Sequence, residues 1–284
     1  MIKFGVSSTP INFRDVSKNS EDMPLYLAQY NLDAFEYQCS RGVKISEEKA
    51  KRLQVESKKH NILMSVHAPY YISLSTIDPM KQQKSIQYII DTARVAKWMG
   101  ATRIVVHSGS LLGLSRAQAL KNACRLLKRA IAALKKEGLE DINICPETMG
   151  KINQLGSSEE VIALCQVDGH CIPTIDFGHL YCRSLGTLVT KSDWIHELEK
   201  YITILGYDRM KYFHSHFSKM EYTEGGEKRH VTFSDTDYGP DYKAVISAIL
   251  ELKLEPRILC ESAGTQDIDA SAMKQWYLSV KDSI

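Results

Sequence analysis

Short apolar segments alternate with longer amphipathic segments along most of this chain. The apolar segments are non-polar along nearly their whole length, which is typical of strands that are buried on both faces of a parallel sheet. Eight such strands are predicted, at residues 2–8, 33–40, 61–68, 102–109, 142–148, 171–178, 210–217 and 256–263.

The segments between the predicted strands favour helices. Residues 46–60 begin at Ser46, a good N-cap residue, and residues 115–138 repeat apolar side chains at helical spacing until Gly138. Further helices are predicted at about residues 80–99, 158–166, 190–204, 240–252 and 265–281.

This alternation predicts the fold class. Eight strand–helix units in 284 residues, with no proline-rich linker or low-complexity segment, favour an α/β fold with one (β/α)8 TIM barrel that spans residues 1–284 as a single domain. A doubly wound open sheet is the alternative, but no GxGxxG motif follows the first predicted strand. In a TIM barrel, the active site lies at the C-terminal ends of the strands.

Composition adds a few exclusions. No apolar run reaches about 18 residues and the first residues lack a signal-peptide core, so we expect no membrane span and a cytoplasmic location. The seven cysteines form no CxxC pair, which favours reduced thiols over disulfides or a cysteine-type zinc site. The net charge of +2 gives no global support for nucleic-acid binding and leaves a local basic groove open.

Side chains of metal-binding type end six successive predicted strands, from the third to the eighth. They are His67, His107, Glu147, Asp176, His214 and Glu261, and His179 follows Asp176 by three residues. A single histidine at a strand end is more often a hydrogen-bonded residue than a ligand, and either of the first two carboxylates alone could cap the next segment. Several carboxylates buried together, however, need a metal, another cation or a proton.

The residue types also indicate the metal chemistry. Imidazole with carboxylate and without thiolate suits Zn, Mn or Fe. Seven candidate ligands are too many for one ion, so the pattern predicts at least two metals bridged by a carboxylate. Sites with two metals stabilise the attacking and leaving oxygens of phosphoryl displacement.

Seven short segments carry a family resemblance. They are VHAPYYISL (66–74), VVHSGS (105–110), CPETMGK (145–151), TIDFGHLYCR (174–183), FHSHFSK (213–219), KRH (228–230) and LCES (259–262). Together they resemble endonuclease IV, the metal-dependent apurinic/apyrimidinic (AP) endonuclease family of the xylose isomerase-like barrel superfamily.

The resemblance implies a trinuclear zinc site, with Mn or Fe as other metals that could occupy it. The first metal would be bound by His67, His107 and Glu147, the second by Glu147, Asp176, His214 and Glu261, and the third by His179 and His230. His216 is interpreted as a residue of the barrel rim and not as a ligand.

Lys228 departs from the family pattern. In the family, the third metal also takes an Asp two residues before the His, and that position is Lys228 here. Glu227 could reach the metal, a water could replace the carboxylate, or the third metal could be weak or absent. Because an ammonium disfavours a nearby cation, we expect weaker occupancy of the third site.

The resemblance further implies contacts with double-stranded DNA that contains an abasic site. Tyr70 and Tyr71 follow His67 where the family inserts residues at the damaged nucleotide, although either could pack on the barrel rim. Arg41, Arg183 and Lys219 are candidate phosphate contacts, with solvated surface roles as the alternative.

The implied reaction is hydrolysis of the phosphodiester 5′ to an abasic site in base excision repair, catalysed by a monomer in which Glu147 bridges metals and Glu261 orients the nucleophile. A sugar isomerase or epimerase of the same superfamily is the alternative, with one divalent ion on Glu147, Asp176, His214 and Glu261. In that case His67, His107 and His230 have no evident task. A damage-binding protein without turnover is a third class.

Overall fold

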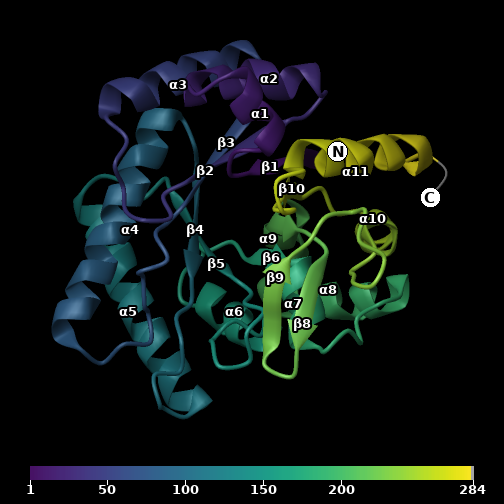
Figure 1. Cartoon of the computed structure of the whole chain (residues 1–284). Helices are drawn as coiled ribbons and strands as arrows, with labels where there is room; N and C mark the ends of the chain where they lie inside the picture. Colours follow the sequence, from purple (N-terminus) through teal and green to yellow (C-terminus); the bar gives the residue numbers. More distant parts are fainter. Residues whose placement is uncertain (283–284) are drawn as a thin grey trace.

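Eight parallel strands close into a barrel in the computed structural model, which describes residues 1–282 (Figure 1). The strands, given in their order around the barrel, are β1 (Lys3–Ser7), β10 (Arg257–Cys260), β7 (His214–Phe217), β6 (Thr174–Asp176), β5 (Asn143–Glu147), β4 (Arg103–His107), β3 (Leu63–His67) and β2 (Ala34–Gln38). Each lies within one of the predicted apolar segments. The prediction of a (β/α)8 barrel is confirmed.

Helices lie outside the strands, as Figure 1 shows. The predicted ones are α3 (Glu47–Lys59), α4 (Pro79–Met99), α5 (Arg116–Lys136), α6 (Ser158–Cys165), α8 (Lys191–Leu205), α10 (Tyr242–Glu251) and α11 (Gln266–Val280). Ser46 caps α3 as expected, since its hydroxyl accepts a hydrogen bond from the Lys49 N–H.

Several short elements were not predicted. These are α1 (Ile11–Val16), η1 (Ser20–Asp22), α2 (Met23–Gln29), α7 (Phe177–Arg183) and α9 (Tyr207–Lys211), together with a hairpin of β8 (Met220–Thr223) and β9 (Gly226–His230). Each is too short to show a clear periodicity. The hairpin stands outside the barrel as a separate antiparallel sheet and packs against α7 (Figure 1).

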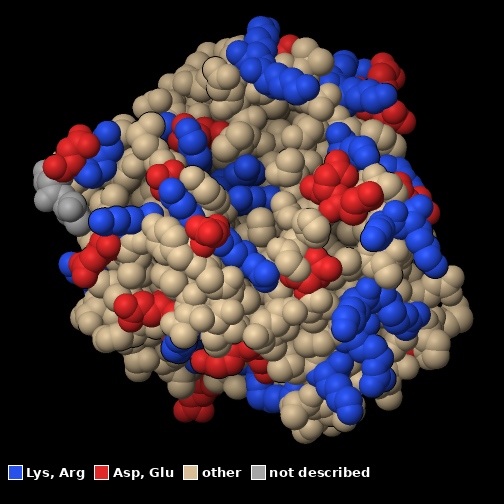
Figure 2. Space-filling model, turned by 180° about the vertical axis from the view of Figure 1, so that it is seen from behind, with Lys and Arg blue, Asp and Glu red and all other residues tan. Residues whose placement is uncertain are grey.

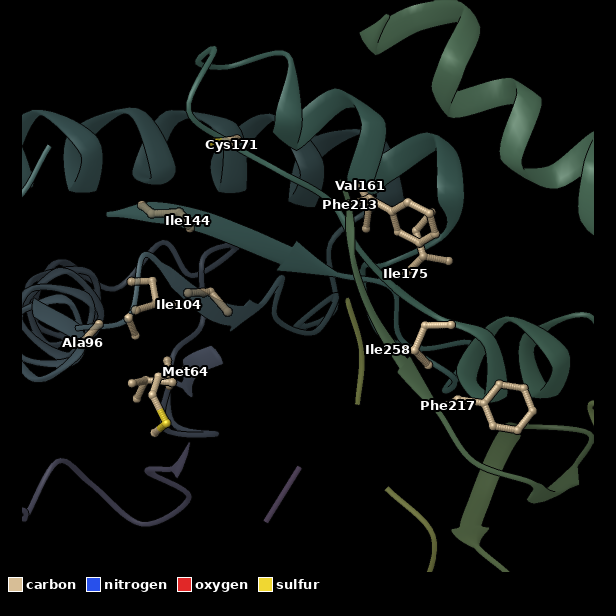
Figure 3. Close-up of a cluster of buried hydrophobic side chains, with 14 of the residues drawn as sticks. Met64, Ala96, Ile104, Ile144, Val161, Cys171, Ile175, Phe213, Phe217 and Ile258 are labelled. Carbon is tan, nitrogen blue, oxygen red and sulfur yellow. The ribbon is translucent and has the colours of Figure 1, made fainter. Parts of the chain in front are cut away.

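Alternate side chains of each strand face the helices, and the remaining ones fill the barrel. The outward set includes Ile104, Ile144, Ile175 and Ile258, which are fully or almost fully buried in the hydrophobic core between sheet and helices (Figure 3). The residues one position further along a strand face the interior. This alternation directs the polar residues at the strand ends into a shared mouth.

The cysteines and the helices bear on two further expectations. All seven cysteines are free thiols, and six of them are buried. No described helix combines the length and apolar character that crossing a bilayer requires.

Basic side chains are unevenly distributed over the surface. The outward face of α5 exposes Lys121, Arg125, Lys128, Arg129, Lys135 and Lys136, and this helix contains no acidic residue. None of the six forms an ion pair with a described residue. α5 lies at the left in Figure 1 and therefore at the right in Figure 2, which is seen from behind. Lys and Arg gather at the lower right of Figure 2.

Glu160 joins the start of α6 to α5. Its carboxylate accepts hydrogen bonds from the N–H groups of Gly156 and Ser157 at 2.8 and 3.0 Å, and Arg116 donates two more at 2.8 Å. Burial by itself raises the Glu160 pKa, but these donors outweigh burial and lower the pKa below its ordinary value of 4.5. The charged form is therefore the stabilising one.

We predict that Glu160→Gln lowers the free energy of unfolding by about 1–3 kcal/mol at neutral pH, because hydrogen bonds to a charged group are lost. A carboxylate with a lowered folded pKa stabilises above its unfolded pKa, and this contribution disappears as pH falls through the folded value. The difference in free energy of unfolding between variant and wild type, measured by urea titration, should therefore shrink below pH 4.5. Glu159→Gln, at a 70% exposed neighbour, is the control and should change stability little.

Candidate metal centre

Among the described residues, three clusters of histidine and carboxylate side chains lie at the C-terminal mouth of the barrel, and the first two share Glu147. They are His67, His107 and Glu147; Glu147, Asp176, His216 and Glu261; and His179, Glu227 and His230. Within each cluster, one potential ligand atom from every residue lies within 4.8 Å of the others. A fourth group, Glu36, His214 and His216, lies deeper in the barrel.

Glu147 connects the first two clusters, as its predicted bridging position requires. Its Oε2 lies 3.3 Å from His67 Nε2 and 3.1 Å from His107 Nε2. Its other oxygen, Oε1, lies 2.8 Å from His216 Nδ1. Burial by itself raises the pKa of this carboxyl, but the neighbouring imidazoles outweigh burial and hold the pKa well below its usual range. Glu147 is therefore an anion with one oxygen turned to each cluster.

Asp176 provides the clearest sign that the second cluster is built for a cation. The residue is fully buried, and its Oδ2 has no hydrogen-bond partner among the described residues. Its other oxygen caps α7 by accepting the His179 N–H at 2.8 Å. Burial raises the Asp176 pKa, and the carboxylates of Glu261 and Glu147 raise it further. A divalent ion would satisfy the free oxygen and offset this repulsion.

Two of the histidines are held so that one ring nitrogen faces the site. Their Nδ1–H groups donate to backbone carbonyls, His67 to Ala68 and His179 to Thr148, each at 2.8 Å. In a neutral imidazole this leaves Nε2 as the free acceptor. The His67 Nε2 faces Glu147 and the His179 Nε2 faces Glu227 at 3.5 Å.

The electrostatics of His179 show how negative the mouth is. Burial by itself lowers the pKa of this histidine, but the carboxylates of Asp176, Glu227, Glu147 and Glu261 outweigh burial and raise the pKa to about 9. A group of buried carboxylates and imidazoles without thiolates fits Zn, Mn or Fe. The donor set that the structure brings together therefore suits divalent metal ions.

The prediction that His214 joins Glu147, Asp176 and Glu261 is wrong, and so is the assignment of His216 to the rim. Strand β7 runs from His214 to Phe217, so His214 begins the strand instead of ending it. Both histidines face the barrel interior, but His216 lies two residues, or about 7 Å, nearer the mouth. His216 is fully buried and its Nδ1 faces the other three residues of the cluster.

A β-bulge decides the outcome at Lys228. Met220 pairs with His230 and Glu221 with Arg229, but Tyr222 then pairs with Glu227, so Lys228 is the extra residue of β9. The bulge turns Glu227 to the same side as His230.

The Lys228 ammonium therefore lies outside the cluster. It is paired with Glu221 at 2.6 Å, with 53% of the side chain exposed. Of the three possibilities at this position, Glu227 as the carboxylate is the one that the structure adopts. The expectation of a weakened third site loses its basis.

The candidate DNA contacts fall into two groups. Tyr70 and Tyr71 are 55% and 58% exposed, and Arg41 is exposed in a turn after β2, so all three are accessible. Arg183 instead donates to the carbonyls of Met149, Lys151 and Gln154. Lys219 donates to the carbonyls of Phe233 and Asp235. These last two side chains hold loops together, so their prediction as phosphate contacts is corrected.

A cavity of about 340 Å³ opens above the clusters. It is lined by Gln38, His67, Tyr70, His107, Glu147, Met149, Lys151, Gln154, His179, Glu227, His230 and Glu261. Lys151, at the end of the CPETMGK segment, is an exposed cation in this lining that the sequence did not single out. Gln38 and Gln154 were also missed, because an amide carries no signal for chemistry on its own.

We predict that Glu227→Gln removes or weakens one bound ion per chain, because an amide is a much poorer metal ligand than a carboxylate. Lys228→Gln, at the next residue but outside the cluster, should leave the metal content unchanged. Elemental analysis after dialysis against Zn²⁺ and then buffer measures both. If only the Lys228 variant lost metal, Glu227 would not be the carboxylate of the third cluster.

Comparisons with known proteins agree with the fold. Residues 25–277 match a family described as xylose isomerase-like TIM barrel. An uncharacterized protein of Methanocaldococcus jannaschii is 32% identical over 262 residues, which cover 92% of each chain. A probable endonuclease 4 of Mycoplasma pneumoniae is 34% identical over 114 residues, which are 37% of this chain and 38% of the relative.

Solved structures share the whole fold at low sequence identity. A D-tagatose 3-epimerase-like protein aligns with a TM-score of 0.76 at 18% identity, covering 99% of both chains. Endonuclease IV from Thermus thermophilus aligns with a TM-score of 0.71 at 17% identity, covering 98% of this chain and 99% of that one.

Proposed function

Because the chain belongs to the xylose isomerase-like TIM barrel family, we propose that it uses its mouth clusters to bind divalent metal ions and hydrolyses the phosphodiester 5′ to an abasic site in double-stranded DNA. The observation that carries this proposal is the third cluster, His179, Glu227 and His230. An epimerase with one ion needs only Glu147, Asp176, His216 and Glu261. The other two clusters would have a use in an enzyme that binds three ions.

The metals, when bound, supply Lewis acidity and lower the pKa of water, which makes a nucleophile available at neutral pH. The chain itself positions the reacting groups. Hydrolysis adds the water oxygen to phosphorus, breaks the P–O bond to the 3′ oxygen and delivers a proton to that oxygen. The products are a 3′-hydroxyl and a 5′-deoxyribose phosphate.

Glu261 suits the role of orienting the water. Its side chain is 17% exposed and lines the cavity, so it can reach a bound substrate. Burial by itself raises its pKa, but His216 and His230 outweigh burial and lower the pKa. The ionised carboxylate can accept a hydrogen bond from water and hold its proton. Glu147 lies deeper and keeps the first two clusters at a fixed separation.

Tyr70 supports a damaged nucleotide as the substrate. Its ring lies 5.5 Å from the ring of His107 and borders the cavity, yet 55% of the residue is exposed. Tyr71 extends the same exposed aromatic edge. Such rings can fill the gap that an abasic or flipped-out nucleotide leaves in the stack.

The basic face of α5 supports a polyanionic substrate. On α3, by contrast, Lys51 and Arg52 pair with Glu47 and Glu48 of the same helix. The six exposed Lys and Arg side chains on the outward face of α5 form no ion pair with a described residue. Because α5 follows the loop at the end of β4, its N-terminal end lies toward the mouth, where a duplex would cross.

The direct test is incision of a duplex oligonucleotide with one tetrahydrofuran abasic analogue. Metal-replete protein should cleave on the 5′ side of the analogue and leave the undamaged duplex intact. Glu261→Gln should lower kcat by 100-fold or more, in line with the usual contribution of positioned acid–base groups. A folded, metal-loaded protein that makes no cut would refute the nuclease.

The charge of α5 gives a second test. Lys121→Glu with Arg125→Glu, the two exposed basic residues nearest the N-terminal end of α5, should weaken duplex binding and reduce the slope of log K against log salt concentration, by about 0.9 for each lost phosphate contact. The kcat should stay the same, because both residues are remote from the clusters. Lys51→Glu with Lys58→Glu on α3 makes the same change in net charge and should bind DNA like the wild type.

A sugar isomerase or epimerase is the second candidate, and the cluster of Glu147, Asp176, His216 and Glu261 favours it specifically. Glu147 and Glu261 would then move a proton beside a carbonyl. The metal count separates the two proposals. One tightly bound ion per chain together with ketose epimerisation would favour the sugar enzyme over the nuclease.

A further inference from the structure

Glu36 is a fully buried carboxylate below the metal clusters, on β2, and the sequence patterns did not single it out. Its Oε1 accepts from Ser7 Oγ at 3.0 Å and from His216 Nε2 at 2.8 Å. Its Oε2 accepts from Ser65 Oγ at 2.9 Å and from His214 Nε2 at 2.8 Å. Each oxygen therefore receives one hydroxyl and one imidazole, which fixes the carboxylate firmly.

The bond to His216 distinguishes this histidine from the other site histidines. His67 and His179 are held by backbone carbonyls at Nδ1 and present Nε2 to the site. His216 is held at Nε2 by a carboxylate and presents Nδ1, which lies 2.8 Å from Glu147 and 3.7 Å from Glu261.

The chemistry of the carboxylate determines the tautomer. An ionised carboxylate only accepts hydrogen bonds, so the His216 Nε2 must carry a proton. In neutral imidazole, Nδ1 is then the free lone pair. A negatively charged acceptor also makes the imidazole a stronger ligand than a carbonyl does.

His214 provides a comparison within the same network. It donates to the other oxygen of Glu36, but its Nδ1 has no hydrogen-bond partner among the described residues. It faces none of the mouth carboxylates. Glu36 thus contacts one histidine that faces the mouth clusters, His216, and one that lies in the barrel core, His214.

We propose that Glu36 is a positioning residue for metal binding: through His216 it orients the ligand nitrogen of the cluster that contains Glu147, Asp176 and Glu261. This inference rests on the metal-binding part of the proposed function and is independent of the substrate. The other clusters do not use His216, so they do not depend on Glu36.

Glu36, His214 and His216 could instead hold an ion of their own, since their ligand atoms are close together. The hydrogen-bond pattern argues against this. Each oxygen of Glu36 already accepts one serine hydroxyl and one imidazole N–H. These four donors satisfy the carboxylate without a metal and leave neither oxygen free for an ion.

The test is competition for Zn²⁺ between the protein and a chromophoric chelator, without DNA. Glu36→Gln keeps the size of the side chain and removes the charge. We expect it to lower the affinity for one of the three ions by about 10–100-fold, the usual effect of removing a residue that hydrogen-bonds to a metal ligand. The other two ions should be released as in the wild type, which also shows that the variant is folded.

His214→Gln is the matched control. It also removes a hydrogen bond to the Glu36 carboxylate, but His214 belongs to none of the three clusters at the mouth. Its three ions should be released as in the wild type. If Glu36→Gln does not fold by circular dichroism, Glu36→Asp keeps the charge but withdraws it from His216 and should weaken the same ion.

Two outcomes would overturn the proposal. One is an unchanged chelator profile for the folded Glu36 variant. The other is a fourth ion in the wild type that is lost in both Glu36→Gln and His214→Gln. Because no substrate is present, neither outcome depends on whether the protein is a nuclease.

Discussion

The mouth of the barrel concentrates carboxylates whose negative charge must be offset by neighbouring groups. Glu147, Asp176 and Glu261 share one cluster, and Glu227 lies in the next. The imidazoles offset part of this charge, yet Asp176 keeps a buried oxygen without a hydrogen bond among the described residues. Burying unpaired charge is costly, so protons on these groups or bound cations must offset it. A metal ion that binds here would therefore also stabilise the mouth.

The histidines prepare the site before any ion arrives. In His67, His179 and His216, one ring nitrogen donates a hydrogen bond to a fixed acceptor and the other faces a carboxylate. Preorganisation of this kind reduces the rearrangement that binding requires. The acceptor behind His216 is itself an anion, so the barrel interior beneath the mouth takes part in tuning the site above it.

The hairpin of β8 and β9 shows how one added residue changes chemistry. Without the bulge, strand alternation would turn Lys228 toward His230 and Glu227 away. The extra residue reverses this order and provides a carboxylate where the motif contains a cation. A comparison of motifs by position alone would conclude that the site lacks a carboxylate. The structure shows an equivalent donor set reached through a different register.

Most of the fold was predictable from the sequence. Continuous apolar segments and amphipathic segments of period 3.6 are local properties of the sequence. The predicted ends of β3, β4, β5 and β6 at His67, His107, Glu147 and Asp176 agree with the structure. Short helices and the hairpin were missed because a few residues carry too little periodicity.

The sequence by itself determined the barrel and placed histidines and carboxylates at most of its strand ends. Only the tertiary structure decided between His214 and His216 and between Glu227 and Lys228. Both choices depend on register, that is, where a strand begins and where a bulge adds a residue. A shift of one or two residues leaves the local pattern almost unchanged but moves a side chain to another face or to another layer of the barrel. The role of Glu36 was hidden for the same reason, since its partners come from β1, β3 and β7 and meet it only when the barrel closes.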